Sequence, residues 1–296
     1  MRRKLVKQGA ATLMVSLPAD WIRQHGLGKG DEIDVEEEQG KLCISKVSQK
    51  EKSSTTIRLT SPVESSVRTS IINAYRAGYD ILNIEYGDER CMVAIQSTLE
   101  KYLLGFDILE RHKNSCILTS ISEPAFEQFH SILQKLITNI GYVIHASIAR
   151  LQKKTPFPDY EAIIFKTYQY DNFCRRIIAK QHFDREFLPD FMGMLINALH
   201  EFLFLNRLLD KQPCQVEHTA LAHLDDAFLL IQKAFTKKDH TAVEKLHETQ
   251  LGYEHFSEDI KNPKRVIPLY HLALASRFLY LSTGPLLGYL LKQPSA

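Results

Sequence analysis

Alternating apolar and polar residues fill most of the first 46 positions of the chain. Four short runs have this period of two, which is typical of β-strands. They are residues 5–8, 12–17, 32–37 and 41–46. Pro18 and Gly26 bracket a short helix, because proline suits the start of a helix and glycine its end. We therefore predict two strands, a helix and a hairpin whose Leu42 and Ile44 point inward.

A polar run separates this segment from the next. Residues 46–56 read KVSQKEKSSTT and contain a single apolar side chain. We interpret 48–56 as a linker that follows a first domain at 1–47. Over 57–122, strand-like and helix-like segments alternate. This alternation predicts a small α+β domain, which we interpret as a spacer or a dimer contact.

Beyond residue 122 the apolar spacing changes to three and four, which is the period of an α-helix. Phe126, Phe129 and Leu133 follow this spacing. Six helical runs are predicted: 123–153, 159–183, 186–210, 215–236, 239–261 and 266–292. Proline or charged residues break the chain between them, and two sets of three suggest an internal duplication. We therefore expect an all-α domain over 123–296 in a multidomain chain.

Length and composition narrow the class of protein. The 296 residues include 37 Lys and Arg against 35 Asp and Glu, a formal charge of +2, so contact with nucleic acid requires a local basic patch. Five cysteines without a CxxC pair argue against a zinc ribbon or a disulfide framework. The most apolar stretch, 278–291, has 14 residues, against the roughly 20 of a membrane span. With no signal-peptide pattern at the start, we expect a cytoplasmic chain without membrane insertion.

Charge is unevenly distributed within the first domain. Its first seven residues carry four positive charges and no acid: Arg2, Arg3, Lys4 and Lys7. Acids gather instead at 31–38. This separation predicts a basic side that meets DNA and an acidic far side. The alternative is that the basic start is a solvated tail.

The size of this domain has a further consequence. A segment of about 46 residues buries too little apolar surface to be stable alone unless a disulfide, a metal or another chain supports it. The sequence offers neither a disulfide nor a metal motif there. We therefore expect a homodimer.

The same segment carries a family resemblance. The residues that support it are Arg3–Gly9, Met14–Pro18, Trp21, Gly26-Leu27, Gly30-Asp31 and Val35. Their spacing resembles the AbrB/MazE-type swapped-hairpin DNA-binding domain. The resemblance implies that two chains interleave their hairpins into one β-barrel. It also implies that DNA is met by the first strand, the loop after it and the short helix.

The resemblance and the charge pattern together assign the DNA contacts. The residues expected to make them are Arg2, Arg3, Lys4, Lys7 and Arg23. Met14 stands where bacterial members of the family often carry an arginine. We interpret Trp21 as a core anchor of the barrel rather than a residue that stacks on bases.

The six helical runs behind such a domain resemble archaeal PhoU-like phosphate uptake regulators. The resemblance rests on architecture and on Tyr170-Asp171-Asn172-Phe173 before Arg175-Arg176. It implies a pair of three-helix bundles that bind partner proteins. Members of that family often hold a metal cluster with E/D-x-x-x-D motifs. Here Asn172 replaces a carboxylate and Glu201 lacks the following aspartate, so we predict no metal and no cofactor.

Other residues capable of chemistry form weaker patterns. His247 and Glu254 lie seven residues apart, as do His218 and Asp225. Each pair therefore shares one helix face, which is more typical of a solvated surface than of a metal site. No Ser-His-Asp or Cys-His arrangement has a recognisable context, so we do not expect an enzyme.

Two functions fit these observations. The first is a transcriptional regulator of phosphate uptake or homeostasis: the barrel binds double-stranded DNA, and the helical domain senses or relays a signal through a protein partner. The second is a PhoU-like adaptor that binds a phosphate transporter or kinase and uses the barrel only to dimerise. An antitoxin-like module is a third interpretation, although the helical domain is larger than the usual antitoxin tail.

Overall fold

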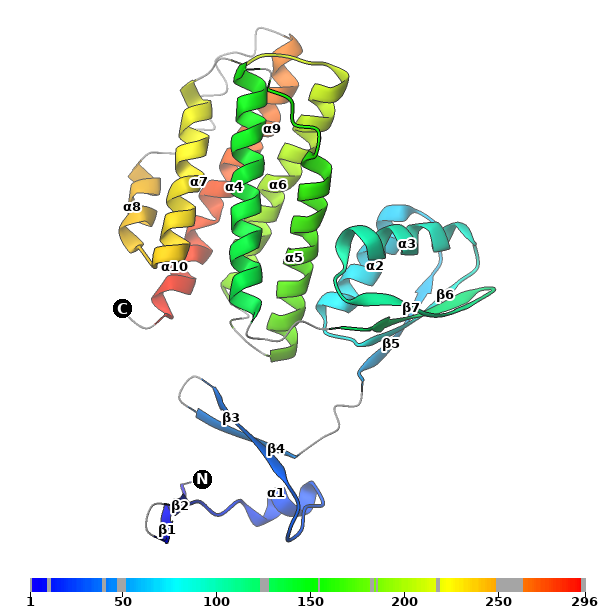
Figure 1. The fold of residues 1–296 in the computed structure, drawn as a ribbon, viewed down its shortest axis with the longest axis vertical. Helices are drawn as coiled ribbons and strands as arrows, with labels where there is room; N and C mark the ends of the chain where they lie inside the picture. Colours follow the sequence, from blue (N-terminus) through cyan, green and yellow to red (C-terminus); the bar gives the residue numbers. More distant parts are fainter. Residues whose placement is uncertain are drawn as a thin grey trace. The chain divides into compact units, whose positions relative to one another are not determined.

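The chain divides into two compact units, residues 1–52 and residues 53–296. The computed structural model describes residues 2–9, 12–38, 41–46, 52–122, 128–153, 155–181, 184, 186–216, 219–248 and 263–293. The first unit contains the short strands and one helix, and the second contains an α+β part and the long helices (Figure 1).

Elements of the first unit follow the predicted order. They are β1 (Val6–Gln8), β2 (Thr12–Met14), α1 (Ala19–Gln24), β3 (Ile33–Glu38) and β4 (Lys41–Lys46). Antiparallel pairing of β1 with β2, and of β3 with β4, makes two separate two-stranded sheets. Within one chain the described strands therefore form hairpins and not a closed barrel.

The hairpin side chains predicted to point inward are not buried in one chain. Leu42 is 68% exposed, and Val35, which pairs with Ile44 across the hairpin, is 54% exposed. Of the side chains described between residues 2 and 46, none is buried. In the single chain these side chains stay unburied because a two-stranded hairpin covers only itself, and their burial in a dimer stays a prediction. A buried face requires a further strand, a helix or another chain.

The second unit opens with the α+β part. Its elements are β5 (Ser54–Leu59), α2 (Glu64–Arg76), β6 (Ile81–Tyr86), α3 (Arg90–Tyr102), β7 (Phe106–His112) and β8 (Ser115–Ser120). The sheet order is β5-β6-β8-β7, with β5 and β6 parallel and the other pairs antiparallel. Both helices cover one face of the sheet (Figure 1). There Val67, Ile71 and Ile95 share a core with Leu82 and Ile84, all with 0% exposure.

β5 begins inside the segment predicted to be a linker. Its first residue, Ser54, pairs with Ile81, and the pairing continues to Leu59 opposite Tyr86. The start of this strand has no apolar residue, so hydrophobic alternation did not reveal it. Threonines nevertheless suit an edge strand, whose backbone is held by its neighbour. The rest of the predicted linker, up to residue 51, lies outside the described residues.

Seven helices make up the rest of the second unit among the described residues. They are α4 (Phe129–Lys153), α5 (Tyr160–Gln181), α6 (Leu188–Lys211), α7 (Thr219–Lys237), α8 (His240–Glu248), α9 (Pro263–Leu281) and α10 (Thr283–Leu291). The last predicted helix is divided at Ser282, because Pro285 has no N–H to donate to the carbonyl of Leu281. The internal duplication stays a prediction.

α6 lies in the core of this bundle. It packs most extensively against α9 and also contacts α4, α5 and α10. Among the described helices it alone is long and apolar enough to cross a membrane, with 24 residues. However, 56% of its most apolar window is buried inside the protein. Packing among the other helices therefore accounts for its apolar composition.

Candidate nucleic-acid interface

Four of the predicted DNA-contacting residues lie in or shortly before the first strand, and we call residues 2–8 the basic strand. Arg2, Arg3 and Lys4 are separated from β1 by Leu5, and Lys7 lies within β1, opposite Leu13 of β2. All four side chains are exposed, and none forms an ion pair with a described residue. Adjacent cations that are not neutralised by acids create a positive potential, which attracts phosphate groups.

Arg23, the fifth predicted contact, has a different environment. It lies in the last turn of α1 and forms an ion pair with Asp20, three residues earlier. The two side chains are 78% and 89% exposed, so the pair is weak and a phosphate can compete for the guanidinium. Within one chain α1 makes no extensive contact with β1 or β2. The structure of one chain therefore does not bring Arg23 to the other four cations.

Local signals in the sequence define both ends of α1. Pro18 is extended and precedes the helix, and its carbonyl accepts the N–H of Ile22. Gly26, with a φ of +60°, follows the helix in the left-handed region that glycine adopts without strain. The ring of Trp21 lies 4.6 Å from that of His25. Trp21 is only partly buried in one chain, so its role as a barrel anchor stays a prediction.

Apolar side chains of the first unit face outward in one chain. Those that are 44–68% exposed are Leu5, Val6, Leu13, Met14, Val15, Val35 and Leu42. We call these seven residues the exposed apolar set. Removing such surface from water stabilises a protein by about 25 cal/mol per Å². Exposed apolar groups in this number are typical of a surface that contacts another chain.

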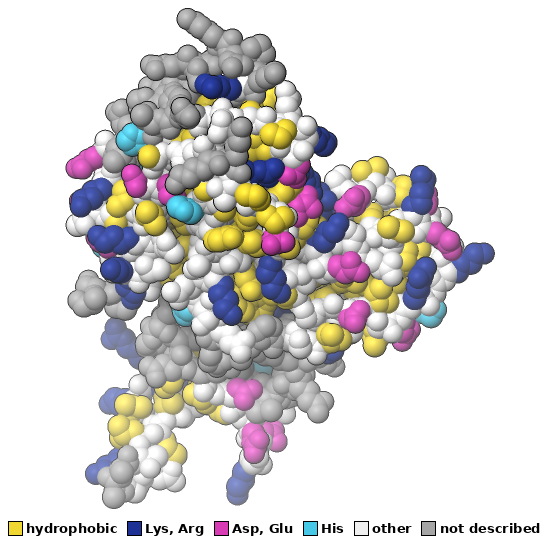
Figure 2. All heavy atoms as spheres, turned by 45° about the horizontal axis from the view of Figure 1, so that its top comes forward, with side chains coloured by type: hydrophobic (Ala, Val, Ile, Leu, Met, Phe, Trp, Pro, Cys, Tyr) yellow, Lys and Arg dark blue, Asp and Glu magenta, His cyan; other side chains and the backbone are white. Residues whose placement is uncertain are grey.

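The second unit lacks a comparable concentration of cations on the face drawn in Figure 2. Basic and acidic side chains are intermixed over that face. In the α+β part, for example, Arg58 pairs with Glu85 at 2.9 Å and Arg90 with Asp88 at 2.7 Å. The basic strand of the first unit is therefore a stronger candidate for contact with DNA than this face of the second unit.

The segment Tyr170–Arg176 of α5 lies at the contact between the bundle and the α+β part. Asp171 is 1% exposed and accepts hydrogen bonds from Arg76 at 2.8 Å and Arg175 at 2.9 Å. Asn172 accepts a hydrogen bond from Arg76 at 2.7 Å and donates one to the carbonyl of Tyr102 at 2.8 Å. Burial lowers the pKa of Arg76, although Asp171 opposes this effect. These side chains therefore join α5 to α2 and α3.

Sequence reasoning missed two residues of this contact, Arg76 and Asp80. Both lie at the turn around Gly78 that leads from α2 into β6. One signal was available in the sequence: Arg176 falls three residues after the buried Phe173, on an apolar helix face. A buried arginine requires carboxylate or carbonyl partners. The pattern does not say which residues these partners are.

No group of three His, Cys, Asp or Glu side chains in the described part of the chain could hold a metal ion. Glu201 accepts instead from His271 at 2.7 Å, and Asp225 contacts His145 at 3.0 Å. Both pairs link neighbouring helices. The other predicted members of the histidine and acid pairs, at positions 218 and 254, lie outside the described residues.

Comparison with known protein families gives a match for the first unit. Residues 6–52 match the family described as "Antidote-toxin recognition MazE, bacterial antitoxin". The match ends at Lys52, where the first compact unit also ends. No curated protein and no solved structure matches the chain. Domains of the MazE/AbrB type commonly bind DNA and dimerise. Residues 6–52 are therefore a MazE/AbrB-type domain, which is consistent with a DNA-binding or antitoxin-type regulator.

Proposed function

We propose that this protein is a homodimeric transcriptional regulator that binds double-stranded DNA through its first unit. The observation that carries the proposal is the combination of four exposed cations and the exposed apolar set within residues 2–46. The apolar side chains favour association of two copies, and association places two basic strands in one particle. The match of residues 6–52 to a MazE-type family supports the same function.

Two copies together present eight cations from residues 2–7. Each phosphate contact contributes about −0.9 to the slope of log affinity against log salt. Six to eight contacts therefore predict a slope of about −5 to −7 for duplex DNA. Arg23 is expected to add less than the strand residues, because Asp20 already partly neutralises it.

The test measures the affinity of the full chain for duplex DNA between 50 and 200 mM salt. We expect the triple variant Arg3→Ala/Lys4→Ala/Lys7→Ala to reduce the magnitude of the slope by about 5, since six cations leave the dimer. Lys113→Ala is the matched control, because this exposed lysine lies in the turn between β7 and β8. The proposal fails if the wild type does not bind at 50 mM salt, or if the triple variant keeps the wild-type slope.

We propose that the helical bundle receives a signal from a protein partner and that this signal regulates phosphate uptake. Support comes from the series of helical runs predicted from the sequence and from the sequence pattern Tyr170-Asp171-Asn172-Phe173 before Arg175-Arg176. Deleting the gene is expected to change transcription of phosphate-uptake genes between phosphate-replete and phosphate-limited cells. Unchanged transcription in both conditions contradicts this finer proposal and leaves DNA binding standing. An adaptor that does not bind DNA is favoured if the chain dimerises but shows no affinity for duplex DNA.

An antitoxin-type regulator is the second candidate, and the description of the matching family favours it. Such a protein neutralises a toxin that is encoded beside it. Growth inhibition by the product of a neighbouring gene, relieved when this chain is co-expressed, supports the antitoxin. If no neighbouring gene encodes a product that inhibits growth, the antitoxin function is excluded.

A further inference from the structure

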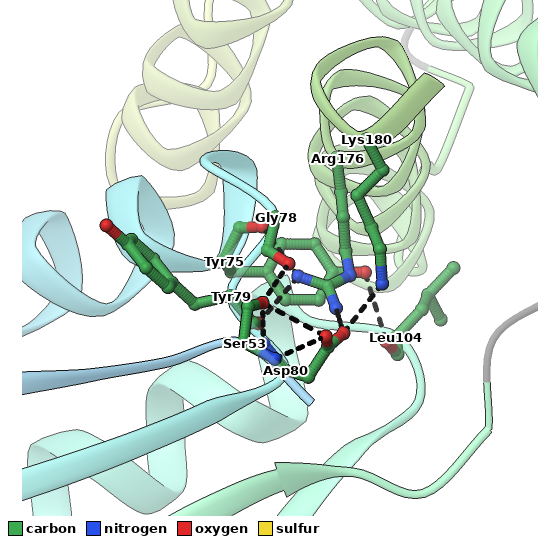
Figure 3. A network of polar contacts seen from close by, with 8 residues as sticks. All are labelled: Ser53, Tyr75, Gly78, Tyr79, Asp80, Leu104, Arg176 and Lys180. Carbon is green, nitrogen blue, oxygen red and sulfur yellow. Dashed lines mark hydrogen bonds and ion pairs between the residues drawn. The ribbon is translucent and has the colours of Figure 1, made fainter. Parts of the chain in front are cut away.

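The residue that connects the two units is held by one carboxylate. Ser53 is the first residue of the second unit and directly precedes β5. Its backbone N–H and its Oγ both donate to Oδ2 of Asp80, each at 3.0 Å. In return the N–H groups of Asp80 and Ile81 donate to the carbonyl of Ser53 at 2.8 and 3.0 Å. Asp80 therefore fixes the point at which the chain enters the second unit (Figure 3).

The other oxygen of the same carboxylate accepts hydrogen bonds from the helical bundle. Oδ1 of Asp80 accepts from Nη2 of Arg176 and from Nζ of Lys180, both on α5 and both at 2.6 Å. Figure 3 shows both side chains reaching down from α5 to the turn that carries Asp80. One oxygen of Asp80 thus binds Ser53, where the chain continues to the first unit, and the other oxygen binds the helical bundle.

Arg176 is buried at this contact. Its side chain is 1% exposed and lies over the rings of Tyr75 and Phe106, 5.0 Å from each centroid. Nη1 donates to the carbonyls of Tyr75 and Tyr79, at 3.0 and 2.7 Å, where α2 ends. The guanidinium therefore ties α5 to α2 and to Asp80 at once, and burial strengthens each of these charged hydrogen bonds.

The absence of a side chain at Gly78 allows Lys180 to reach the carboxylate of Asp80. Its φ of +96° suits glycine, and a Cβ there would lie 2.9 Å from Cγ of Lys180. The stem of the lysine therefore crosses the turn where a larger residue would block it. Burial alone would raise the pKa of Asp80, but hydrogen bonds from Lys180 and Ser53 outweigh it and hold the pKa below its usual value.

We propose that the position of α5 in the bundle is coupled to the position of Ser53, the residue at which the first unit joins the second. The coupling passes through a cluster that we call the Asp80 junction: Ser53, Asp80, Arg176 and Lys180. A shift of α5 moves the Oδ1 partners, turns the carboxylate and so displaces the Oδ2 partner, Ser53. Because coupling is reciprocal, DNA that restrains Ser53 through the first unit also acts on α5. This second consequence rests on the proposed function, whereas the coupling between α5 and Ser53 does not.

The first arm of the test needs no DNA. Hydrogen exchange is measured for the full chain and for Lys180→Met, which removes one Oδ1 partner from a side chain that is 26% exposed. We expect exchange at the amides of Ser53 and Ile81 to rise at least threefold, while amides of the β7–β8 hairpin keep their wild-type rates. Lys166→Met is the control, because this lysine also lies on α5 but contacts Gln169. Unchanged exchange at Ser53, or an equal rise in the hairpin, overturns the proposal.

The second arm adds duplex DNA at 50 mM salt. DNA is expected to change exchange over residues 176–181 of α5 in the wild type and in Lys166→Met, and to change it by less than half as much in Asp80→Asn. Circular dichroism verifies that Asp80→Asn is folded, and Lys180→Met replaces it if it is not. DNA that binds the wild type without affecting α5 overturns the coupling to DNA. DNA that does not bind overturns the proposed function, and the coupling is then decided by the first arm.

Discussion

Arg176→Met is expected to lower the free energy of unfolding of the second unit by about 3–5 kcal/mol, the usual cost of removing one partner from a buried ion pair. Methionine is apolar and reaches about as far as Nε of the arginine, so the space over the Tyr75 and Phe106 rings that the guanidinium fills is left partly empty. Methionine also cannot donate hydrogen bonds. In the variant the carbonyl of Tyr79 loses the guanidinium as a donor. The carbonyl of Tyr75 and Oδ1 of Asp80 each lose one donor as well, although Tyr75 still accepts from the N–H of Gly78 and Asp80 from Lys180.

Urea denaturation followed by circular dichroism at the helix band measures this loss. Tryptophan fluorescence does not, because the single tryptophan, Trp21, belongs to the first unit. Lys166→Met provides the comparison, since it also replaces a cation by methionine on α5 but at an exposed position. It should change stability by less than about 0.5 kcal/mol. A change below about 1 kcal/mol in Arg176→Met would show that the buried guanidinium contributes little.

Leu42→Asp is expected to abolish the dimer and to weaken duplex binding by more than about 100-fold. Leu42 is 68% exposed in one chain, and a charge at such a position normally costs little. If a second copy covers this side chain, the aspartate loses its hydration without gaining a partner. Loss of the dimer then halves the number of cations in each particle, and the affinity for DNA falls with them.

Sedimentation or light scattering measures the mass, and duplex binding is measured on the same samples. The matched control is Leu109→Asp, because Leu109 is 59% exposed on β7 of the second unit. That variant should keep the mass and the affinity of the wild type. A dimeric Leu42→Asp that binds DNA normally places the contact between chains elsewhere on the molecule.

Prediction from sequence succeeded where the signal is local. The order of strands and helix in the first unit follows from alternation, from Pro18 and from Gly26, all of which act within a few residues. The cations before and within β1 are visible in the same way. The start of β5 was missed because Ser54 and its neighbours are polar, and only pairing with β6 makes them a strand.

The division of α9 from α10 depends on a single residue, Pro285, which the hydrophobic periodicity did not reveal. Apolar residues continue through Ser282, so the spacing predicts one helix. The missing N–H of Pro285 divides it. Here the single residue mattered more than the pattern around it.

Hydrophobic period, turn residues and charge are properties of neighbours in the chain. They already define the elements of the first unit and its basic strand, and they lead to the expectation that it dimerises. Contacts between distant residues are decided only when the chain folds. Asp80 and Arg176 are 96 positions apart, and Ser53 is 27 positions before Asp80. Their meeting depends on how α5 packs on α2, because no short pattern encodes which carboxylate a buried guanidinium will reach. Only the tertiary structure therefore shows that the segment around Asp171 and Arg176 connects the helical bundle to the α+β part of the second unit.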